Sequence, residues 1–352
     1  MGQHSLRSIA AVTFLLLATG CGGLRLHLRN SSVQPPSNVA MYFTVATADG
    51  APLPGLTAER FNIYEDGTLI STYESQQTIL NPEVAAERYT LLLLDMSGSV
   101  VESGQVPLIQ EAASAFVANV GDQEKVAVYA FDGRAEIQEI SGFDDSIGRS
   151  AGGLNRLGGW RTEDPSTNLY GAVVEAARVL TEAREASEAP LRFGTLVVFT
   201  DGTDRAHRAT GGQALRAVSS ADIGMFTIGL GGEVDRDELQ ELGVDGYVHA
   251  EAGDTVVQAF EQIAGQIQLV ASAYYLLSYC SPSRAGTHRL EIEAVHGDQK
   301  GRASFRFDAT DFDSGCDPNT PPGDFEVPGI EDAQRQQRRG GRRSRPGAFS
   351  ID

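Results

Sequence analysis

Cysteine is scarce in this sequence, since only Cys21, Cys280 and Cys316 occur among 352 residues. Three scattered cysteines are too few for a structural zinc site, which needs clustered ligands. Basic residues are also few, because 28 lysines and arginines stand against 47 aspartates and glutamates, a net charge of −19. A phosphate backbone requires a basic protein surface, so the composition argues against nucleic acid as a partner.

The amino-terminal hydrophobic run is short. It covers residues 9–18 behind Arg7, which is too little to span a bilayer but has the form of a secretory signal over residues 1–20. The run ends in Leu-Leu-Ala-Thr-Gly-Cys, which resembles a bacterial lipobox and implies that Cys21 carries lipid and anchors the chain to a membrane of the cell envelope. The alternative is an ordinary cleavage site at Ala18-Thr19-Gly20 and a secreted or periplasmic protein.

Two segments follow the signal. Residues 21–38 are rich in Gly, Ser, Pro and Asn without an apolar period, which predicts a flexible tether. Residues 39–85 alternate β-forming and polar residues and contain an Asp66-Gly67 turn, which predicts a small β segment.

The centre of the sequence is the run from Thr90 to Leu94, which stops at Asp95. Five β-forming or apolar residues without alternation predict a strand covered on both faces, as in a parallel α/β sheet. Asp95, Ser97 and Ser99 then fall at the carboxyl end of this strand, where such sheets bind ligands. One carboxylate with two hydroxyls suits a hard cation such as Mg²⁺, Mn²⁺ or Ca²⁺.

This Asp-Met-Ser-Gly-Ser motif resembles the metal-ion-dependent adhesion site of the von Willebrand factor type A domain. Thr167 in Ser-Thr-Asn-Leu-Tyr-Gly-Ala and Asp201 in Val-Val-Phe-Thr-Asp-Gly-Thr-Asp match the two remaining site positions of that family. The resemblance covers residues 88–272. It implies a doubly wound, mostly parallel α/β sheet with helices on both faces, which the alternation of apolar strands and amphipathic helices in this range also predicts.

The same resemblance implies a role for each site residue. Ser97, Ser99 and Thr167 contact a divalent cation directly or nearly so, with Mg²⁺ as the expected ion and Mn²⁺ or Ca²⁺ as alternatives. Asp95 and Asp201 ligate the cation directly or through water. One coordination position stays open for an Asp or Glu carboxylate of a protein partner.

Two other functions are alternatives to cation-dependent protein binding. One is a metal-independent assembly scaffold in the cell envelope. The other is a serine hydrolase with Ser97 as nucleophile, which is disfavoured because the sequence lacks the glycine two positions earlier that a nucleophile elbow needs. No enzymatic activity is therefore expected.

The carboxyl-terminal region contains β-rich runs at 274–281, 287–296 and 301–309. Short turns between them predict an antiparallel meander over 273–313, and three strands alone are marginal, so we expect them to pair with residues 39–85. Residues 314–352, which are rich in Pro and then in Arg, are expected to be a disordered tail.

Two cysteines remain once Cys21 is assigned to lipid. Export places Cys280 and Cys316 in an oxidising compartment, so they are expected to form a disulfide. In a meander the first and third strands run in the same direction, which would bring both cysteines to one end of the sheet.

Overall fold

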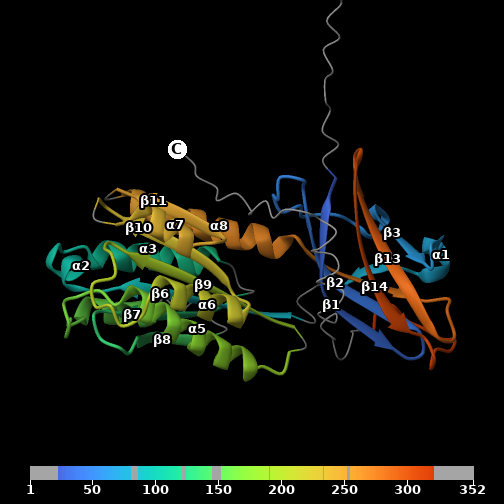
Figure 1. Ribbon diagram of the computed structural model, residues 1–352, viewed down its shortest axis with the longest axis horizontal. Coiled ribbons are helices and arrows are strands. Elements are labelled where there is room, and N and C mark those ends of the chain that lie inside the picture. The colour runs from blue at the N-terminus through green and yellow to red at the C-terminus, as the bar shows by residue number, and fades with distance from the viewer. Residues whose placement is uncertain are drawn as a thin grey trace, which may run out of the picture.

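The computed structural model describes residues 23–80, 86–120, 124–144, 152–189, 191–232, 234–251 and 254–320. These residues form an α/β unit and a β-sandwich that lie side by side along the long axis (Figure 1). The signal segment, Cys21 and residues 321–352 of the predicted tail lie outside the described residues. The prediction of disorder from residue 314 is wrong at its start, because Cys316 forms a disulfide and the Asp317 carbonyl accepts a hydrogen bond from the Asn38 side chain. Within the described part of the chain, no helix has the length and apolar character needed to cross a membrane.

The α/β unit is built on one six-stranded sheet with the order β11-β10-β9-β6-β7-β8. All neighbouring strands are parallel except β7 and β8, which are antiparallel. The strands are β6 (Ala86–Asp95), β7 (Glu124–Phe131), β8 (Gln138–Asp144), β9 (Leu191–Thr200), β10 (Gly224–Leu230) and β11 (Gly246–Ala250).

Helices cover both faces of this sheet, as a fully apolar central strand requires. Leu92 and Leu94 of β6 pack towards α3 and α8, while Leu91 and Leu93 pack towards α5, α6 and α7. The helices are α2 (Gly98–Glu102), α3 (Val106–Asn119), η3 (Leu154–Gly159), α5 (Leu169–Glu185), α6 (Gly211–Ala221), α7 (Arg236–Leu242) and α8 (Asp254–Ser272). The unit is therefore doubly wound.

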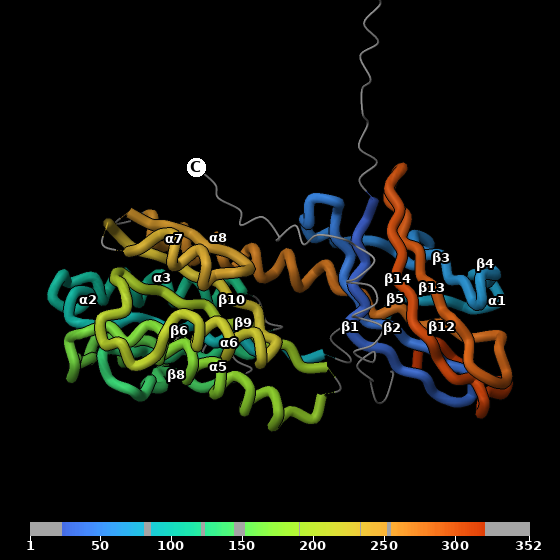
Figure 2. Tube along the Cα trace, in the orientation of Figure 1, coloured from blue at the N-terminus to red at the C-terminus, as the bar shows by residue number. Residues whose placement is uncertain are grey.

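The β-sandwich combines both flanks of the chain. One sheet has the order β1-β2-β12-β5 and the other β14-β13-β3-β4, and their facing side chains form a single core. Its strands are β1 (Arg25–Gln34), β2 (Asn38–Ala46), β3 (Phe61–Glu65), β4 (Thr68–Leu69), β5 (Thr78–Leu80), β12 (Tyr274–Cys280), β13 (Thr287–His296) and β14 (Gln299–Asp308), with the short helices η1 (Ala58–Arg60) and α1 (Thr72–Ser75) between them. Figure 2 shows α8 running from the α/β unit to the start of β12.

The prediction of a flexible tether at 21–38 is wrong over most of its length. Residues 25–34 form β1, which pairs antiparallel with β2. Leu24 and Leu26 are only 6% and 7% exposed, so the start of this segment belongs to the sandwich core. The strand was not predicted because the segment contains polar residues such as Ser31 and Ser32. Both are buried against the partner strand despite their polarity.

The predicted three-stranded meander is also wrong. β12 pairs with β2 and β5, whereas β13 and β14 pair with each other and with β3 in the opposite sheet. The division follows from burial, because a sheet with one apolar face needs a second sheet to cover it. The pairing of 273–313 with 39–85 is present, but it runs through two sheets.

A disulfide joins Cys280 to Cys316 with 5.8 Å between the Cα atoms. It ties the end of β12 to the segment that follows β14. The two cysteines meet because the two sheets pack face to face. The predicted disulfide is therefore present, but the reason given for it, that both cysteines lie at one end of a single three-stranded sheet, is wrong.

Candidate metal site

The first part of the site lies where β6 ends and α2 begins. Asp95 is fully buried, and its two carboxylate oxygens have separate donors. Oδ1 accepts a hydrogen bond of 2.9 Å from the backbone N–H of Ser97, and Oδ2 accepts one of 2.6 Å from the Thr200 hydroxyl. The carboxylate is therefore fixed in orientation by its own loop and by the neighbouring strand β9.

The second part is a chain of hydroxyls that links two loops. The Ser97 and Ser99 hydroxyl oxygens are 3.3 Å apart, and Ser99 Oγ donates to Asp201 Oδ1 over 2.9 Å. Asp201 directly follows β9, which lies beside β6 in the sheet. Two apolar strands that both end in aspartate thus bring their carboxylates to one edge, as the sequence predicts.

Thr167 comes from a third loop and reaches the same edge. Its backbone carbonyl accepts the N–H groups of Arg205 and Ala206 at 2.9 and 3.0 Å. A Cβ atom placed on Gly202 would lie 3.7 Å from Thr167 Oγ1, so this hydroxyl faces the residue that follows Asp201. All five residues singled out in the sequence therefore lie at the carboxyl ends of β6 and β9.

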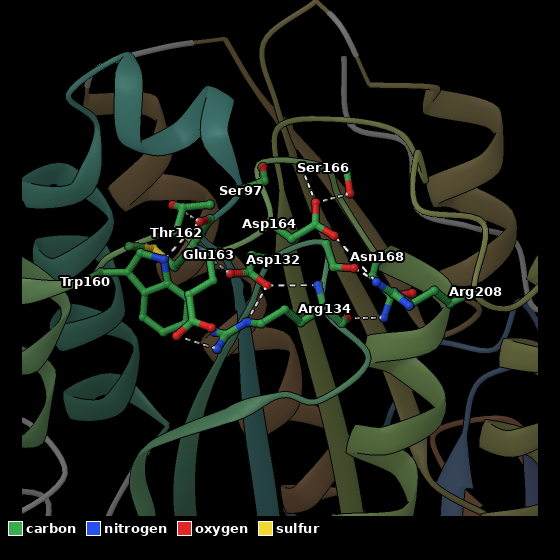
Figure 3. Close-up of polar contacts among 12 residues, drawn as sticks. Ser97, Asp132, Arg134, Trp160, Thr162, Glu163, Asp164, Ser166, Asn168 and Arg208 are labelled. Carbon is green, nitrogen blue, oxygen red and sulfur yellow. Dashed lines mark hydrogen bonds and ion pairs between the residues drawn. The ribbon is translucent and has the colours of Figure 1, made fainter.

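A buried carboxylate that the sequence analysis missed holds the Thr167 loop. Asp132, fully buried just beyond β7, accepts hydrogen bonds of 2.9 Å from both the backbone N and the Nε of Arg134 (Figure 3). Its second oxygen accepts the N–H of Glu163 at 3.2 Å, and its backbone carbonyl accepts the N–H of Asn168. The signal for Asp132 was present, since β7 is a third apolar strand that runs directly into an aspartate.

Further bonds tie this loop to the end of β6. Trp160 Nε1 and Thr162 Oγ1 both donate to the carbonyl of Met96, at 3.1 and 3.0 Å (Figure 3). Gly98 N–H donates to the carbonyl of Pro165 at 3.0 Å. The loop that carries Thr167 and the loop that carries Ser97 and Ser99 are therefore one connected assembly.

Two further residues escaped sequence reasoning. The Thr200 hydroxyl donates a hydrogen bond to Asp95, whereas the sequence indicates only that Thr200 is the last residue of an apolar strand. Asp204 accepts the N–H groups of Tyr170 and His207 at 3.2 and 3.0 Å, which ties the loop after β9 to the first turn of α5. The sequence Thr-Asp-Gly-Thr-Asp contains both residues, but nothing in a single sequence separates a ligand from a residue that supports one.

Burial raises the pKa of Asp95 to about 7. The hydrogen bond from Thr200 opposes the shift, while the negative charge of Asp201 adds to it. Two carboxylates close together in a buried setting repel each other, and a cation between or beside them would remove that cost.

The donor set fits a hard cation. It consists of two carboxylates and three hydroxyls, and all of these donors are oxygens. In the described part of the chain no group of three or more His, Cys, Asp or Glu side chains is placed to hold a metal. A cation here would therefore depend on the hydroxyls of Ser97, Ser99 and Thr167 as well as on the carboxylates.

Comparisons with known proteins yield structural neighbours only. No protein-family profile matches the chain, and no curated protein matches it. A von Willebrand factor type A protein from Catenulispora acidiphila is 12% identical with a TM-score of 0.45, and the match covers 83% of this chain and 75% of that one. The manganese-loaded TRAP protein of Plasmodium vivax is 13% identical with a TM-score of 0.44, over 66% of this chain and 96% of that one.

A third neighbour is proximal thread matrix protein 1 of the mussel byssus with zinc in its MIDAS motif. It is 16% identical with a TM-score of 0.40, and the match covers 58% of this chain and 49% of that one. Similarities at these identities concern the fold alone. The manganese and zinc are ligands of those neighbours.

Proposed function

We propose that this chain is an exported protein, anchored by lipid at Cys21, that binds a protein partner through a divalent cation. Ser97, Ser99 and Thr167 would hold the cation with Asp95 and Asp201, and Mg²⁺ is the ion we favour. The observation that carries the proposal is the bond from Ser99 to Asp201, which joins residues 102 positions apart at the carboxyl edge of the sheet.

The exposure of the site residues supports partner binding. Asp95 and Ser97 are buried, whereas Ser99 is exposed and Asp201 is half-buried. The site therefore opens to solvent on the side of Ser99 and Asp201. A cation with few carboxylate ligands supplies Lewis acidity, and an Asp or Glu of a partner is the natural group to complete its shell from that side.

Thermal melts test the cation. A ligand that binds only the folded state stabilises it by about 2.7 kcal/mol at one hundred times its dissociation constant. We expect a higher melting temperature in Mg²⁺ or Mn²⁺ than in EDTA for the wild type and for Glu111→Gln, whose exposed side chain lies on α3 away from the site. Ser99→Ala should respond weakly, and an equal response in all three proteins would place the cation elsewhere.

Affinity capture from membrane extracts tests the partner. Capture of a specific protein in Mg²⁺ that is lost in EDTA is the expected result. Capture that survives EDTA and the Ser99→Ala substitution would favour a metal-independent scaffold instead.

Mass spectrometry of the amino-terminal peptide tests the anchor. A diacylated or triacylated Cys21 is expected, together with recovery in the membrane fraction. An unmodified amino terminus, with the protein recovered in a soluble fraction, would contradict the lipid anchor and favour simple secretion.

A further inference from the structure

The sandwich holds the chain almost from the cysteine at which lipid is proposed. The N–H of Leu24 donates to the carbonyl of Lys300 on β14 over 3.0 Å, and Leu24 is buried in the sandwich core. A Cβ atom placed on Gly23 would lie 2.7 Å from the same carbonyl oxygen, so Gly23 already lies against β14. In the sequence only Gly22 separates Gly23 from Cys21.

This short spacing limits the distance between the sandwich and a lipid on Cys21. Two residue steps of fully extended chain cover about 7 Å. A lipidated Cys21 lies at the surface of the bilayer, because its acyl chains are inside the membrane and its backbone is polar. Gly23, and the part of the sandwich that holds it, therefore stays next to the headgroups.

Three segments form this end of the sandwich, which we call the anchored end: residues 23–27, the loop 46–52 after β2, and the hairpin tip 296–301. Arg25 of β1 pairs with Ala46 at the end of β2. The hairpin tip joins β13 to β14 and includes Lys300, which holds Leu24. Figure 2 shows the start of β1 and the tip of this hairpin at the same end of the sandwich.

The anchored end is less acidic than the protein as a whole. The chain carries a net charge of −19, which anionic headgroups would repel. The exposed charges of the three segments are balanced, because Arg25 and Lys300 stand with Asp49 and Asp298. Among the described residues, none of the exposed large hydrophobic side chains lies on these segments. This surface can therefore meet headgroups without repulsion and without entering the hydrocarbon region.

The metal site lies away from the anchored end. Ala86 and Leu191, at the starts of β6 and β9, pack against Ala40, Tyr42 and Leu276 of the sandwich. The candidate site lies at the opposite ends of these two strands, and a strand of ten residues such as β6 spans about 33 Å. Contact between the anchored end and a membrane would therefore leave the site uncovered.

We propose that the anchored end of the sandwich rests on the lipid headgroups of the membrane and leaves the metal site free to meet a partner. This inference rests on the lipid anchor at Cys21 that is part of the proposed function. The short covalent link holds the surface in place, and neither net charge nor an inserted apolar side chain is needed.

Short-range fluorescence quenching tests this orientation. The lipidated full chain is placed in phosphatidylcholine vesicles that carry a nitroxide quencher on the headgroup. Cys280 and Cys316 are joined and Cys21 carries the lipid, so one introduced cysteine is the only free thiol for the fluorophore. Asp298→Cys places the fluorophore at the hairpin tip, and we expect it to lose most of its fluorescence.

Arg306→Cys is the matched control on the same hairpin. Arg306 is also exposed on β14, and the eight residues from Asp298 correspond to about 26 Å along the strand. The fluorophore at this position should lose almost no fluorescence. Circular dichroism of both labelled variants checks that the fold is kept.

A spacer tests whether the short link is the cause. Insertion of about 20 Gly and Ser residues between Gly22 and Gly23 adds a flexible chain with an average span of roughly 25 Å. The fluorophore at position 298 should then recover most of its fluorescence. Without the spacer, added salt or phosphatidylglycerol should leave the quenching unchanged, because charge does not hold the surface.

Mass spectrometry of the same preparation separates the possible failures. Absence of lipid on Cys21 would overturn the anchor and this inference together. If lipid is present, no quenching at position 298, or equal quenching at positions 298 and 306, would overturn this inference and leave the anchor intact. Quenching at position 298 that survives the spacer would show that the surface binds headgroups by itself, which would overturn the role of the short link.

Discussion

Glu87 lies near the start of β6 and is held by three side chains. Its Oε2 accepts hydrogen bonds from Tyr89 and Ser187 at 2.6 and 2.7 Å, and its Oε1 lies 2.9 Å from Lys125 Nζ. Burial by itself would raise the pKa of Glu87, but the bonds from Ser187, Tyr89 and Lys125 outweigh it and lower the pKa to about 2. The charged form is therefore favoured by folding.

A folded-state pKa below the unfolded value of 4.5 gives a definite pH dependence. The stabilisation is complete above about pH 4.5 and is lost as the pH falls towards 2. Glu87→Gln should lower the free energy of unfolding by about 1–2 kcal/mol at pH 7, a figure reduced because the side chain is partly exposed. Urea titrations from pH 7 to pH 3 should show this difference shrinking, whereas Glu111→Gln should show little difference at any pH. A constant difference for Glu87→Gln would contradict the assignment.

Gly98 permits the close approach of two loops at the site. A Cβ atom on Gly98 would come within 2.9 Å of Pro165 Cβ and 3.2 Å of the Pro165 carbonyl oxygen. Pro165 precedes Thr167 by two residues, so pushing it away would move Thr167 from Ser97 and Ser99.

Gly98→Ala should therefore lower stability by about 1–3 kcal/mol through overpacking and should also reduce the Mg²⁺-dependent rise in melting temperature. Gly159→Ala is the control in the segment leading into the same loop, because a Cβ there meets nothing within 4 Å. A full response to Mg²⁺ in Gly98→Ala would show that the contact with Pro165 is not needed for the site.

At the scale of elements, the sequence predicted those strands and helices whose apolar residues form a clear pattern. β6 and β9 are nearly continuous apolar runs that end in polar residues, so their burial and their shared edge followed from pattern alone. α6 escaped prediction because only Ala214 and Val218 of its eleven residues are buried. Its capping box, Thr210 with Gln213, is a local signal of a helix start in the sequence.

The site followed the same rule. Asp95, Ser97, Ser99, Thr167 and Asp201 were singled out because they form motifs, and the structure brings them together at one edge of the sheet. Thr200 was missed because its contribution is a hydrogen bond to a carboxylate on the neighbouring strand, which depends on three-dimensional contact and leaves no pattern in one sequence. Asp132 follows a third apolar strand, but only the structure shows that its carboxylate holds the loop that carries Thr167.

The disulfide links the segment that follows β14 covalently to the end of β12. The cysteines are 36 residues apart, and closing a loop of this length stabilises a protein by about 3–4 kcal/mol in the chain-entropy account. The variant with Cys280→Ser and Cys316→Ser should lose about that amount in urea unfolding. Thiol labelling of the denatured, unreduced wild type should find neither cysteine free.

The metal response offers a control for this experiment. The bridge lies in the sandwich and the site lies at the carboxyl edge of the central sheet, so the double variant should keep its Mg²⁺-dependent rise in melting temperature. Labelling of Cys280 and Cys316 in the unreduced protein would contradict the bridge, and loss of the Mg²⁺ response would show that the bridge is needed for the shape of the metal site.

At the scale of the whole molecule, local pattern was least informative. The sequence predicts β-rich flanks around an α/β unit, but the assignment of β12 and β13 to opposite sheets depends on contacts over more than two hundred residues. The contact between the two units was not predicted at all, because the aromatic residues that make it come from β2, β9 and β12.

That contact is a cluster of three rings. Tyr42 lies 5.2 Å from both Phe193 and Tyr274, and Phe193 lies 5.3 Å from Tyr274. No loop separates the units here, since α8 ends at Ser272, β12 begins at Tyr274, and Ala273 between them accepts a hydrogen bond from Val45. The two units should therefore unfold together.

Phe193→Ala should uncouple them. It removes two ring contacts worth about 1–3 kcal/mol together, nearly all of it from the interface between the units. Trp160 is the only tryptophan and lies in the α/β unit, so its fluorescence reports that unit, while far-UV circular dichroism reports both. In the wild type the two melting curves should coincide, and in Phe193→Ala they should separate.

Phe143→Ala is the control. It removes a comparable ring contact with Tyr89 inside the α/β unit, and its two curves should shift while remaining together. Coincident curves in Phe193→Ala would mean that the aromatic cluster does not couple the two units.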